Sequence, residues 1–179
     1  MEPTFYSRPV VEVARDLIGC TVSHAGARGV IVETEAYHQS ETACHAHVGL
    51  TPRTHILFGP PGRAYVYRSY GIHWCANLVC SRAGMGAAVL LRAMFPTGGV
   101  ETIQKRRGEV RPWDLANGPG KLTAALGMTR AHDQQPMRAS EVVVRSGIVV
   151  PDEEIRVTPR IGITKAVDWP LRYLWTRSS

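Results

Sequence analysis

The chain has 179 residues, 44% of them apolar, which is enough for one folded domain and excludes an intrinsically disordered protein. Its formal net charge is +6, and 18 of its 21 basic residues are arginine. No apolar run approaches the ~18–20 residues that span a bilayer, so a membrane-embedded protein is excluded, and the arginine excess favours a nucleic-acid partner.

The first residues show neither the basic nor the apolar region of an export signal. Four cysteines are present at irregular spacing, at positions Cys20, Cys44, Cys75 and Cys80. We therefore expect free thiols in a reducing compartment, which indicates the cytoplasm of a bacterium-like cell.

The first predicted element is a helix that Ser7 caps, Pro9 begins and Gly19 ends. Strands are predicted over 20–22 and 29–37. The segment 38–58 has no clear period, so we expect a long loop of the kind that carries function.

Three further strands are predicted over 64–70, 72–80 and 87–94, and their short turns indicate an antiparallel sheet. Alternation in the second strand places His73, Cys75 and Asn77 on one face. Helices follow over 100–107 and 121–126, then strand-prone segments at 141–150 and 154–158. The tail over 160–177 is basic and rich in aromatic residues.

The strand Val30–Tyr37 holds two acids among β-branched residues. Strict alternation places Ile31, Glu33, Glu35 and Tyr37 on one face. Arg92 is the one charge in the apolar strand 87–94. Two lone opposite charges in apolar strands predict that Glu35 and Arg92 meet, either as a structural ion pair or as a general base with its orienting cation.

Aromatic side chains gather near the predicted strand ends and in the long loop, and rings of this kind could hold a planar ligand such as a base. They are Tyr37, His45, Tyr65, Tyr67, Tyr70 and His73. For Tyr65 we favour an ordinary core role. Tyr70 lies near Arg68 and before Gly71, so we expect it at an exposed basic tip, where its ring could act as a wedge.

Two weaker signals remain. Zinc-ligand types occur at Cys44, His45, His47, His73, Cys75 and Cys80, but their spacing fits no standard finger or ribbon, so we predict no metal site. The amides of Gly118-Pro119-Gly120-Lys121 could receive a DNA phosphate, although an ordinary helix start explains them equally well.

Short stretches match one family in order: VETEAY at 32–37, TPR at 51–53, PG with YVY at 61–67, YG at 70–71, C-x-N at 75–77, VLLRA at 89–93, ET at 101–102, GPGKL at 118–122 and PRIGI at 159–163. The chain thereby resembles the alkyladenine (3-methyladenine) DNA glycosylases of the mammalian type, which also occur in bacteria. The resemblance implies an α+β fold: one compact domain over 1–179, with a curved antiparallel sheet flanked by short helices. It implies a cofactor-free, metal-free enzyme without lyase activity that hydrolyses the N-glycosidic bond of alkylated, and also deaminated, purines.

The resemblance also implies roles for single residues. Glu35 matches the glutamate that activates water, Arg92 the arginine that helps to hold that water, and Tyr70 the wedge that enters the duplex. The base-binding pocket is matched by Tyr37, His45, Tyr67 and Asn77, of which Asn77 would clash with the amino group of guanine. The spacing from Tyr37 to His45 is one residue shorter than in the mammalian form, so His47 competes with His45 for its role.

The expected partner is double-stranded DNA with damaged purines, bound by a monomer that is associated with the nucleoid only through DNA. Candidate contacts to the DNA backbone are Arg53, Arg68, Gly120 and Lys121. Two rival classes remain open from the residues: a non-catalytic nucleic-acid-binding module, which would explain the arginines and rings, and a metal-dependent hydrolase, which would explain the histidines and cysteines.

Overall fold

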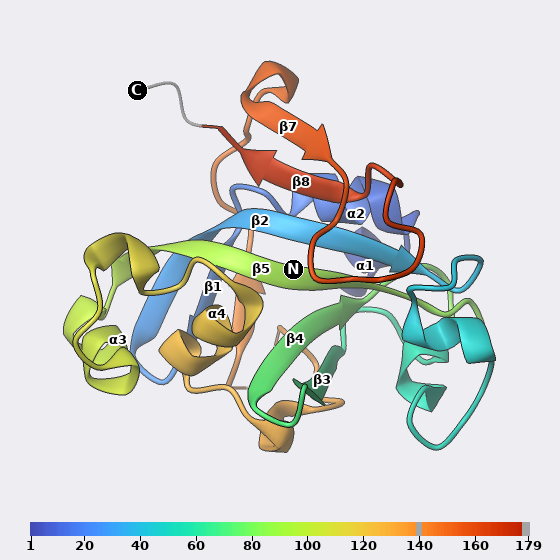
Figure 1. Ribbon diagram of the computed structural model, residues 1–179, viewed down its shortest axis with the longest axis horizontal. Coiled ribbons are helices and arrows are strands. Elements are labelled where there is room, and N and C mark those ends of the chain that lie inside the picture. Colours follow the sequence, from blue (N-terminus) through green and yellow to red (C-terminus); the bar gives the residue numbers. More distant parts are fainter. Residues whose placement is uncertain (139–140, 177–179) are drawn as a thin grey trace.

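The sheet is built around β2 (Ala27–His38), the strand that carries Glu35. In the computed structural model, which describes residues 1–138 and 141–176, β2 pairs along nearly its whole length with β5 (Ala87–Gly98). Its other edge pairs with β1 (Thr21–His24) near the start and with β8 (Arg172–Trp175) near the end. One strand therefore contacts three neighbours (Figure 1). Glu35 pairs with Leu90 of β5 on one side and with Arg172 of β8 on the other.

The remaining strands extend the sheet in antiparallel order. They are β3 (Ala64–Ser69), β4 (His73–Val79), β6 (Val143–Arg145) and β7 (Ile155–Thr158). The order is β3-β4-β5-β2-β1-β6, and β8 joins β2 to β7. The predicted strands are thus confirmed, except that β8 lies in the tail, where no strand was predicted.

Short helices cover the sheet. They are α1 (Pro3–Tyr6), α2 (Val10–Asp16), α3 (Val100–Arg107) and α4 (Pro119–Leu126), with 3₁₀ turns at His45–Val48, His55–Phe58, Pro112–Asp114, Arg130–His132 and Asp152–Glu154. The apolar stripes of α2 and α4 pack into one core with residues of the central strands, including Ile31, Leu78 and Leu91. The α+β prediction of a single compact domain is confirmed. Among the described residues no helix is both long and apolar enough to cross a membrane.

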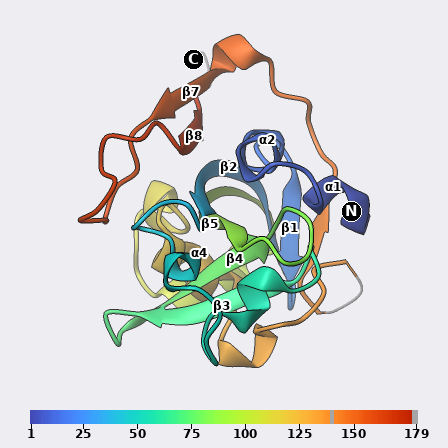
Figure 2. The same cartoon turned by 90° about the vertical axis from the view of Figure 1, so that its right-hand side faces the viewer.

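The segment 38–58, predicted as a loop, contains two 3₁₀ turns and packs over β3, β4 and β5. Its apolar residues form a second, smaller cluster with those strands: Cys44, Ala46, Ile56 and Leu57 against Tyr65, Val79 and Ala88. In Figure 2 this segment and the loop between β7 and β8 are seen from the same side of the molecule. Both segments border the candidate site described below.

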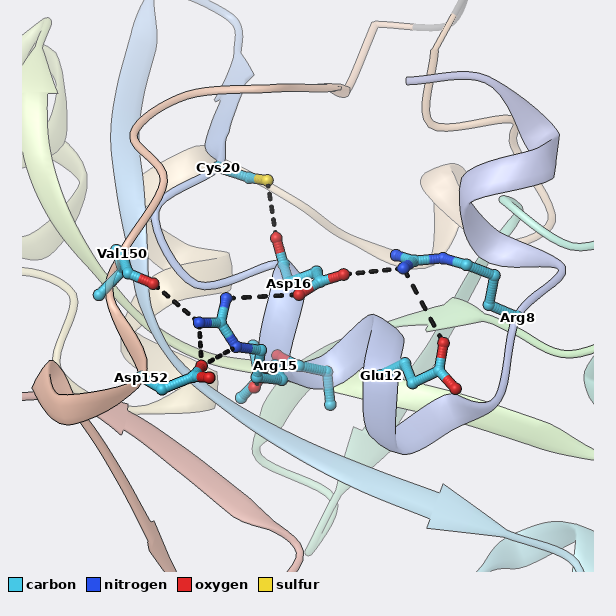
Figure 3. A network of polar contacts seen from close by, with 9 residues as sticks. Arg8, Glu12, Arg15, Asp16, Cys20, Val150 and Asp152 are labelled. Carbon is cyan, nitrogen blue, oxygen red and sulfur yellow. Dashed lines mark hydrogen bonds and ion pairs between the residues drawn. The ribbon is translucent and has the colours of Figure 1, made fainter.

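The helix predicted from Ser7 to Gly19 is wrong at both ends. Pro9 occupies the position before α2, and the Ser7 hydroxyl donates to Pro3 O at 3.0 Å instead of capping α2. The end of α2 is fixed by ion pairs instead (Figure 3): Arg8 Nη1 contacts Asp16 Oδ2 at 2.8 Å, and Arg15 binds Asp152. The Arg15 contacts fasten α2 to the segment that precedes β7.

The strict alternation predicted for β2 is also wrong. The pairing of β2 with β5 shifts register between Ile31 and Glu33 and again between Glu33 and Thr34. Such bulges change which face a side chain occupies. Ile31 therefore lies in the main core together with Ala36, whereas Tyr37 packs against the second cluster.

Candidate active site

Glu35 is fully buried, and each of its carboxylate oxygens has a donor. Oε2 accepts the Tyr37 hydroxyl at 2.8 Å, and Oε1 accepts the backbone N–H of Ile161 at 3.0 Å. Arg92 Nη1 lies 3.3 Å from Oε2. The predicted meeting of Glu35 and Arg92 is confirmed, and these donors give both oxygens of an otherwise costly buried carboxylate a hydrogen-bond or ion-pair partner.

Glu33 holds the opposite side of the same guanidinium. Its Oε1 accepts Arg92 Nε at 2.9 Å and Arg172 Nε, from β8, at 2.6 Å. Arg92 therefore bridges the two acids of β2, and Arg172 supplies a further positive charge. This arrangement fixes the plane of the Arg92 guanidinium beside Glu35.

Tyr37 lines a cavity and contacts Glu35. Burial raises the pKa of the Tyr37 hydroxyl, and the neighbouring Glu35 carboxylate raises it further. The hydroxyl therefore stays protonated and donates a hydrogen bond to Glu35. The Arg160 guanidinium lies 4.5 Å from the centre of the Tyr37 ring. Arg160 is itself held by a buried ion pair with Glu41 and by Ala36 O at 2.9 Å. These contacts fix the ring at the boundary between carboxylate and cavity.

The cavity has a volume of about 390 Å³, inside the range of about 300–1,000 Å³ that is typical of small-ligand pockets. Its wall combines the end of β2, the start of β5, the segment 38–58, the β3–β4 hairpin and the loop between β7 and β8. Predicted site residues in the wall are Tyr37, His45, Arg53, Tyr67, Arg68, Tyr70 and Asn77. Residues that are far apart in the sequence thus meet at one aromatic cavity.

His45 is held neutral in this wall. Burial, and to a lesser extent the positive charge of the nearby Arg53, lowers the pKa of His45 to about 4. Arg53 Nη2 lies 3.4 Å from His45 Nε2, and His45 Nδ1 lies 3.0 Å from the Tyr65 hydroxyl. Because a guanidinium can only donate, Nε2 accepts and Nδ1 carries the proton. A neutral imidazole adds no positive charge to the cavity.

Tyr67 and Asn77 form the floor beside His45. The Tyr67 ring centre lies 4.7 Å from that of His45, nearly perpendicular at 73°. Asn77 is buried and its Nδ2 donates to Tyr65 O at 3.0 Å, which fixes the side-chain amide. The alternation predicted for β4 is confirmed, because Ala76 and Leu78 lie in the main core on the opposite face.

Tyr70 lies at the tip of the β3–β4 hairpin, with 84% of its surface exposed. Ile72 N–H donates to Ser69 O at 3.0 Å, and both residues between them have positive φ, 50° for Tyr70 and 69° for Gly71. A two-residue turn of this kind favours glycine or asparagine, so a tyrosine here is strained. The predicted exposed tip near Arg68 is confirmed.

Other predicted residues lie elsewhere. His47 contacts Gln39 O at 3.0 Å and is not part of the cavity wall, so the geometry favours His45 in the competition between the two. Gly120 and Lys121 lie at α4, where the Lys121 ammonium contacts Asp114 Oδ1 at 3.0 Å and Asn117 Oδ1 at 2.8 Å. Neither residue is part of the cavity wall.

Sequence reasoning missed several residues that build the site. Arg160 and Ile161 belong to the PRIGI stretch, which carried the resemblance but received no role, although they contact Tyr37 and Glu35. Arg172 lies in the basic tail, where it was given no role, although it contacts Glu33. Tyr65 was favoured as a core residue, and it is buried, but its hydroxyl also orients His45.

A family model described as methylpurine-DNA glycosylase matches residues 4–179. The chain belongs to the methylpurine-DNA glycosylase family.

Similar proteins bear the provisional name 3-methyladenine DNA glycosylase. One from Rhodopseudomonas palustris is 52% identical over 169 residues, covering 94% of this chain and 81% of its own length. One from Bradyrhizobium diazoefficiens is 50% identical, covering 97% and 86%, and one from the archaeon Methanoculleus marisnigri is 47% identical, covering 94% and 91%.

Membership of the methylpurine-DNA glycosylase family makes this protein a DNA-repair enzyme of the DNA glycosylase type, with DNA as its substrate. The resemblance seen in the short motifs is confirmed. The rival hypothesis of a non-catalytic nucleic-acid-binding module is wrong, because the family is one of enzymes.

Proposed function

We propose that this methylpurine-DNA glycosylase flips a damaged purine out of duplex DNA into the aromatic cavity, where Glu35 activates the water that cleaves the N-glycosidic bond. One observation carries the proposal: a fully buried carboxylate, Glu35, accepts a hydrogen bond from the hydroxyl of Tyr37, which lines the cavity. A purely structural ion pair would not need to adjoin a pocket of ligand size.

The rings of the cavity suit the chemistry of the substrate. An N3- or N7-alkylated purine carries positive charge, which the faces of Tyr37 and Tyr67 stabilise. The neutral His45 avoids repelling that charge. Flipping costs a few kcal/mol and least at a damaged pair, so extrusion itself contributes to selection. Tyr70 would fill the gap that the base leaves in the duplex.

Glu35 can accept one further hydrogen bond at Oε1. Each carboxylate oxygen can accept two hydrogen bonds, and Oε1 has one described donor, the Ile161 N–H. A water at the second position would lose a proton to Glu35 while attacking the sugar, and the carboxylate would oppose the positive charge that develops on the sugar. Gly162 and Ile163, next to Ile161, line the cavity, so this segment joins the carboxylate to the pocket.

The selectivity of the site follows from its fixed amide. Because Tyr65 O fixes Asn77, the amide cannot turn away from a larger base, and we propose that it obstructs the amino group of guanine. Deaminated purines such as hypoxanthine lack that group and fit the same space. They are uncharged, so their release requires protonation of the leaving base in addition to attack by water.

The decisive test is Glu35→Gln, which keeps the shape of the side chain and removes its basicity. We expect single-turnover excision of 3-methyladenine from duplex DNA to fall by at least about 100-fold, with DNA affinity little changed. Glu109→Gln, at an exposed carboxylate outside the cavity, is the control. Excision by Glu35→Gln at the control rate would refute the mechanism.

We also propose that the enzyme has no lyase activity and needs no metal for chemistry. None of the lysines among the described residues lines the cavity, so no side-chain amine is placed to form an imine with the sugar. Borohydride treatment during turnover should therefore trap no covalent complex with DNA. Excess EDTA should leave purine release unchanged, whereas a metal-dependent hydrolase would lose activity.

A further inference from the structure

Two histidines and a glutamate meet outside the aromatic cavity, in a place that the proposed chemistry does not use. His24 ends β1, and His132 ends the 3₁₀ turn Arg130–His132. Both rings are buried, with 9% and 8% of their surface exposed. Glu141 lies beside them with a side chain that is 83% exposed.

The three ligand atoms have the spacing of a metal site. His24 Nε2 and His132 Nε2 are 3.2 Å apart, and Glu141 Oε2 lies 3.6 and 3.7 Å from them. In a tetrahedral zinc site with bonds of about 2.05 Å, neighbouring ligand atoms are about 3.3–3.4 Å apart. The exposed Glu141 side chain can close the small remaining difference by rotating.

The surroundings of His24 prepare it as a ligand. His24 Nδ1 lies 2.6 Å from Leu126 O. A carbonyl only accepts hydrogen bonds, so Nδ1 carries the proton and the neutral ring presents the Nε2 lone pair. A backbone carbonyl in this position is the usual partner of a metal-bound histidine, because it fixes both tautomer and ring orientation.

His132 can adopt either tautomer. Its Nδ1 lies 3.0 Å from Thr129 N and 3.2 Å from Thr129 O. With Nδ1 accepting the Thr129 N–H, Nε2 carries the proton and donates to His24. With Nδ1 donating to Thr129 O, the proton leaves Nε2 and both histidines present lone pairs to one point. Metal binding therefore requires a tautomer exchange and no net release of a proton.

An ion could reach this point from solvent. An open hollow of about 450 Å³ borders it, lined by residues 23–28, Gly98, Gly99 and Glu141. Arg28 also lines the hollow and disfavours cations there, so the Glu141 carboxylate is needed to offset its charge. Two imidazoles suit zinc and similar transition metals, whereas magnesium and calcium prefer oxygen ligands.

We propose that His24, His132 and Glu141 form a Zn²⁺ site, with the fourth coordination position open to water. Such an ion links the end of β1 to the chain that follows α4 and to the segment before β6. It acts on the stability of this part of the fold and takes no part in base excision.

The test uses the untagged full-length protein, freed of metal with a chelator, and Zn²⁺ as the titrant in calorimetry. We expect about one ion per chain and a melting temperature that rises with Zn²⁺ but not with Mg²⁺. His24→Gln and His132→Gln should each weaken Zn²⁺ binding by at least about tenfold. His55→Gln, at an exposed histidine outside the cluster, is the matched control and should bind as the wild type does.

Glu141→Gln covers the case in which a buried histidine variant fails to fold, because Glu141 is exposed. We expect it to fold and to bind Zn²⁺ about tenfold more weakly. Titration with Co²⁺ adds a direct readout, since tetrahedral nitrogen and oxygen ligands give visible d–d bands without a thiolate charge-transfer band. Equal Zn²⁺ affinity in the wild type and in Glu141→Gln, or a Co²⁺ spectrum that shows thiolate ligands, would overturn the proposal. The two histidines would then share only a hydrogen bond.

Discussion

At the scale of single residues, the two acids of β2 differ in what surrounds them. Glu33 contacts two arginines, whereas Glu35 contacts one arginine, a tyrosine hydroxyl and a backbone N–H. Arg92 donates to Glu33 through Nε and contacts Glu35 through Nη1. We infer that Glu33 orients Arg92 so that Arg92 can orient Glu35 and its water.

Glu33→Gln tests this inference. The variant replaces the ion pair between Glu33 and Arg92 by a weaker neutral contact, and it leaves the Arg172 guanidinium without its carboxylate partner. Misplacement of a catalytic group costs up to about 100-fold in rate, so we expect single-turnover excision to fall by about 10- to 100-fold, with DNA affinity nearly unchanged. The exposed Glu12→Gln is the control. Excision at the rate of the control variant would show that Arg92 is positioned without Glu33.

The lowered pKa of His45 predicts that the stability of the protein depends on pH. Its folded pKa of about 4 lies below the ordinary 6.5, so between these values the unfolded chain binds a proton that the folded protein does not. The contribution of the neutral His45 to the free energy of unfolding is complete above pH 6.5 and is lost as the pH falls toward 4. Allowing for solvent screening of a half-buried ring, we expect a loss of about 1–2 kcal/mol.

The measurement is chemical denaturation of the wild type and His45→Gln at several pH values. The difference in their free energies of unfolding should shrink between pH 6.5 and 4 and be constant above pH 7. His55→Gln, at an exposed histidine, should follow the wild type. A constant difference across this range would place the His45 pKa near its ordinary value.

Residue types and alternation predicted much of the site, and the failures have physical causes. Glu35 and Arg92 were predictable because an unpaired charge in an apolar strand is costly. Ile31 was placed on the wrong face because a bulge is a property of pairing with β5, which the β2 sequence alone does not show. Arg160 and Ile161 were missed because they reach Glu35 and Tyr37 from more than a hundred residues away.

At the scale of elements, the β3–β4 hairpin carries Tyr70 at a position that suits tyrosine poorly. A positive φ costs a residue with a Cβ of the order of 1–2 kcal/mol. Tyr70→Asn should therefore raise the free energy of unfolding by about 0.5–1 kcal/mol while weakening base flipping. Fluorescence of a base analogue in duplex DNA reports flipping separately from excision.

Ile72→Asn is the matched control for Tyr70→Asn, because Ile72 is exposed in the same turn but is not among the residues with positive φ. We expect no gain in its stability and a smaller effect on flipping. Unchanged flipping in Tyr70→Asn would refute the wedge. Lower stability in Tyr70→Asn would show that the tyrosine ring makes contacts that outweigh its backbone strain.

The loop between β7 and β8 is fastened to the segment 38–58 by a buried ion pair between Arg160 and Glu41. Removing one partner of a buried pair costs about 3–5 kcal/mol, because the other charge is left uncompensated. We expect Arg160→Met and Glu41→Met each to destabilise the protein by that amount. Combining them should restore much of the loss, and a double variant as unstable as the sum of both would contradict a paired role.

Short length and long-range contacts explain why no strand was predicted in the tail. The strand β8 has only four residues and pairs with β2 and β7. So short a strand leaves little alternation to read, and its position depends on contacts such as that of Arg160 with Ala36 O. Helix α3, by contrast, begins and ends where predicted, at Val100 and Arg107, since Gly99 and Gly108 flank it.

At the scale of the whole molecule, the net charge of +6 predicts binding that depends strongly on salt. The arginines are not equivalent in this respect. Arg53 and Arg68 line the cavity, near the exposed tip at Tyr70, whereas the Lys121 ammonium is already held by Asp114 and Asn117. Arg145 lies on β6, at the opposite edge of the sheet from β3.

These positions give a graded prediction for duplex binding measured at several salt concentrations. The slope of log K against log salt concentration is negative, and each lost phosphate contact makes it shallower by about 0.9. Arg68→Gln should show that full reduction, because its exposed guanidinium lies over the Trp74 ring, close to the hairpin tip. Lys121→Gln should show less, since its charge is neutralised by Asp114 before DNA arrives, and Arg145→Gln should show none. Equal slopes for Arg68→Gln and Arg145→Gln would mean that DNA does not cross the hairpin tip, and the cavity would then need another approach for its base.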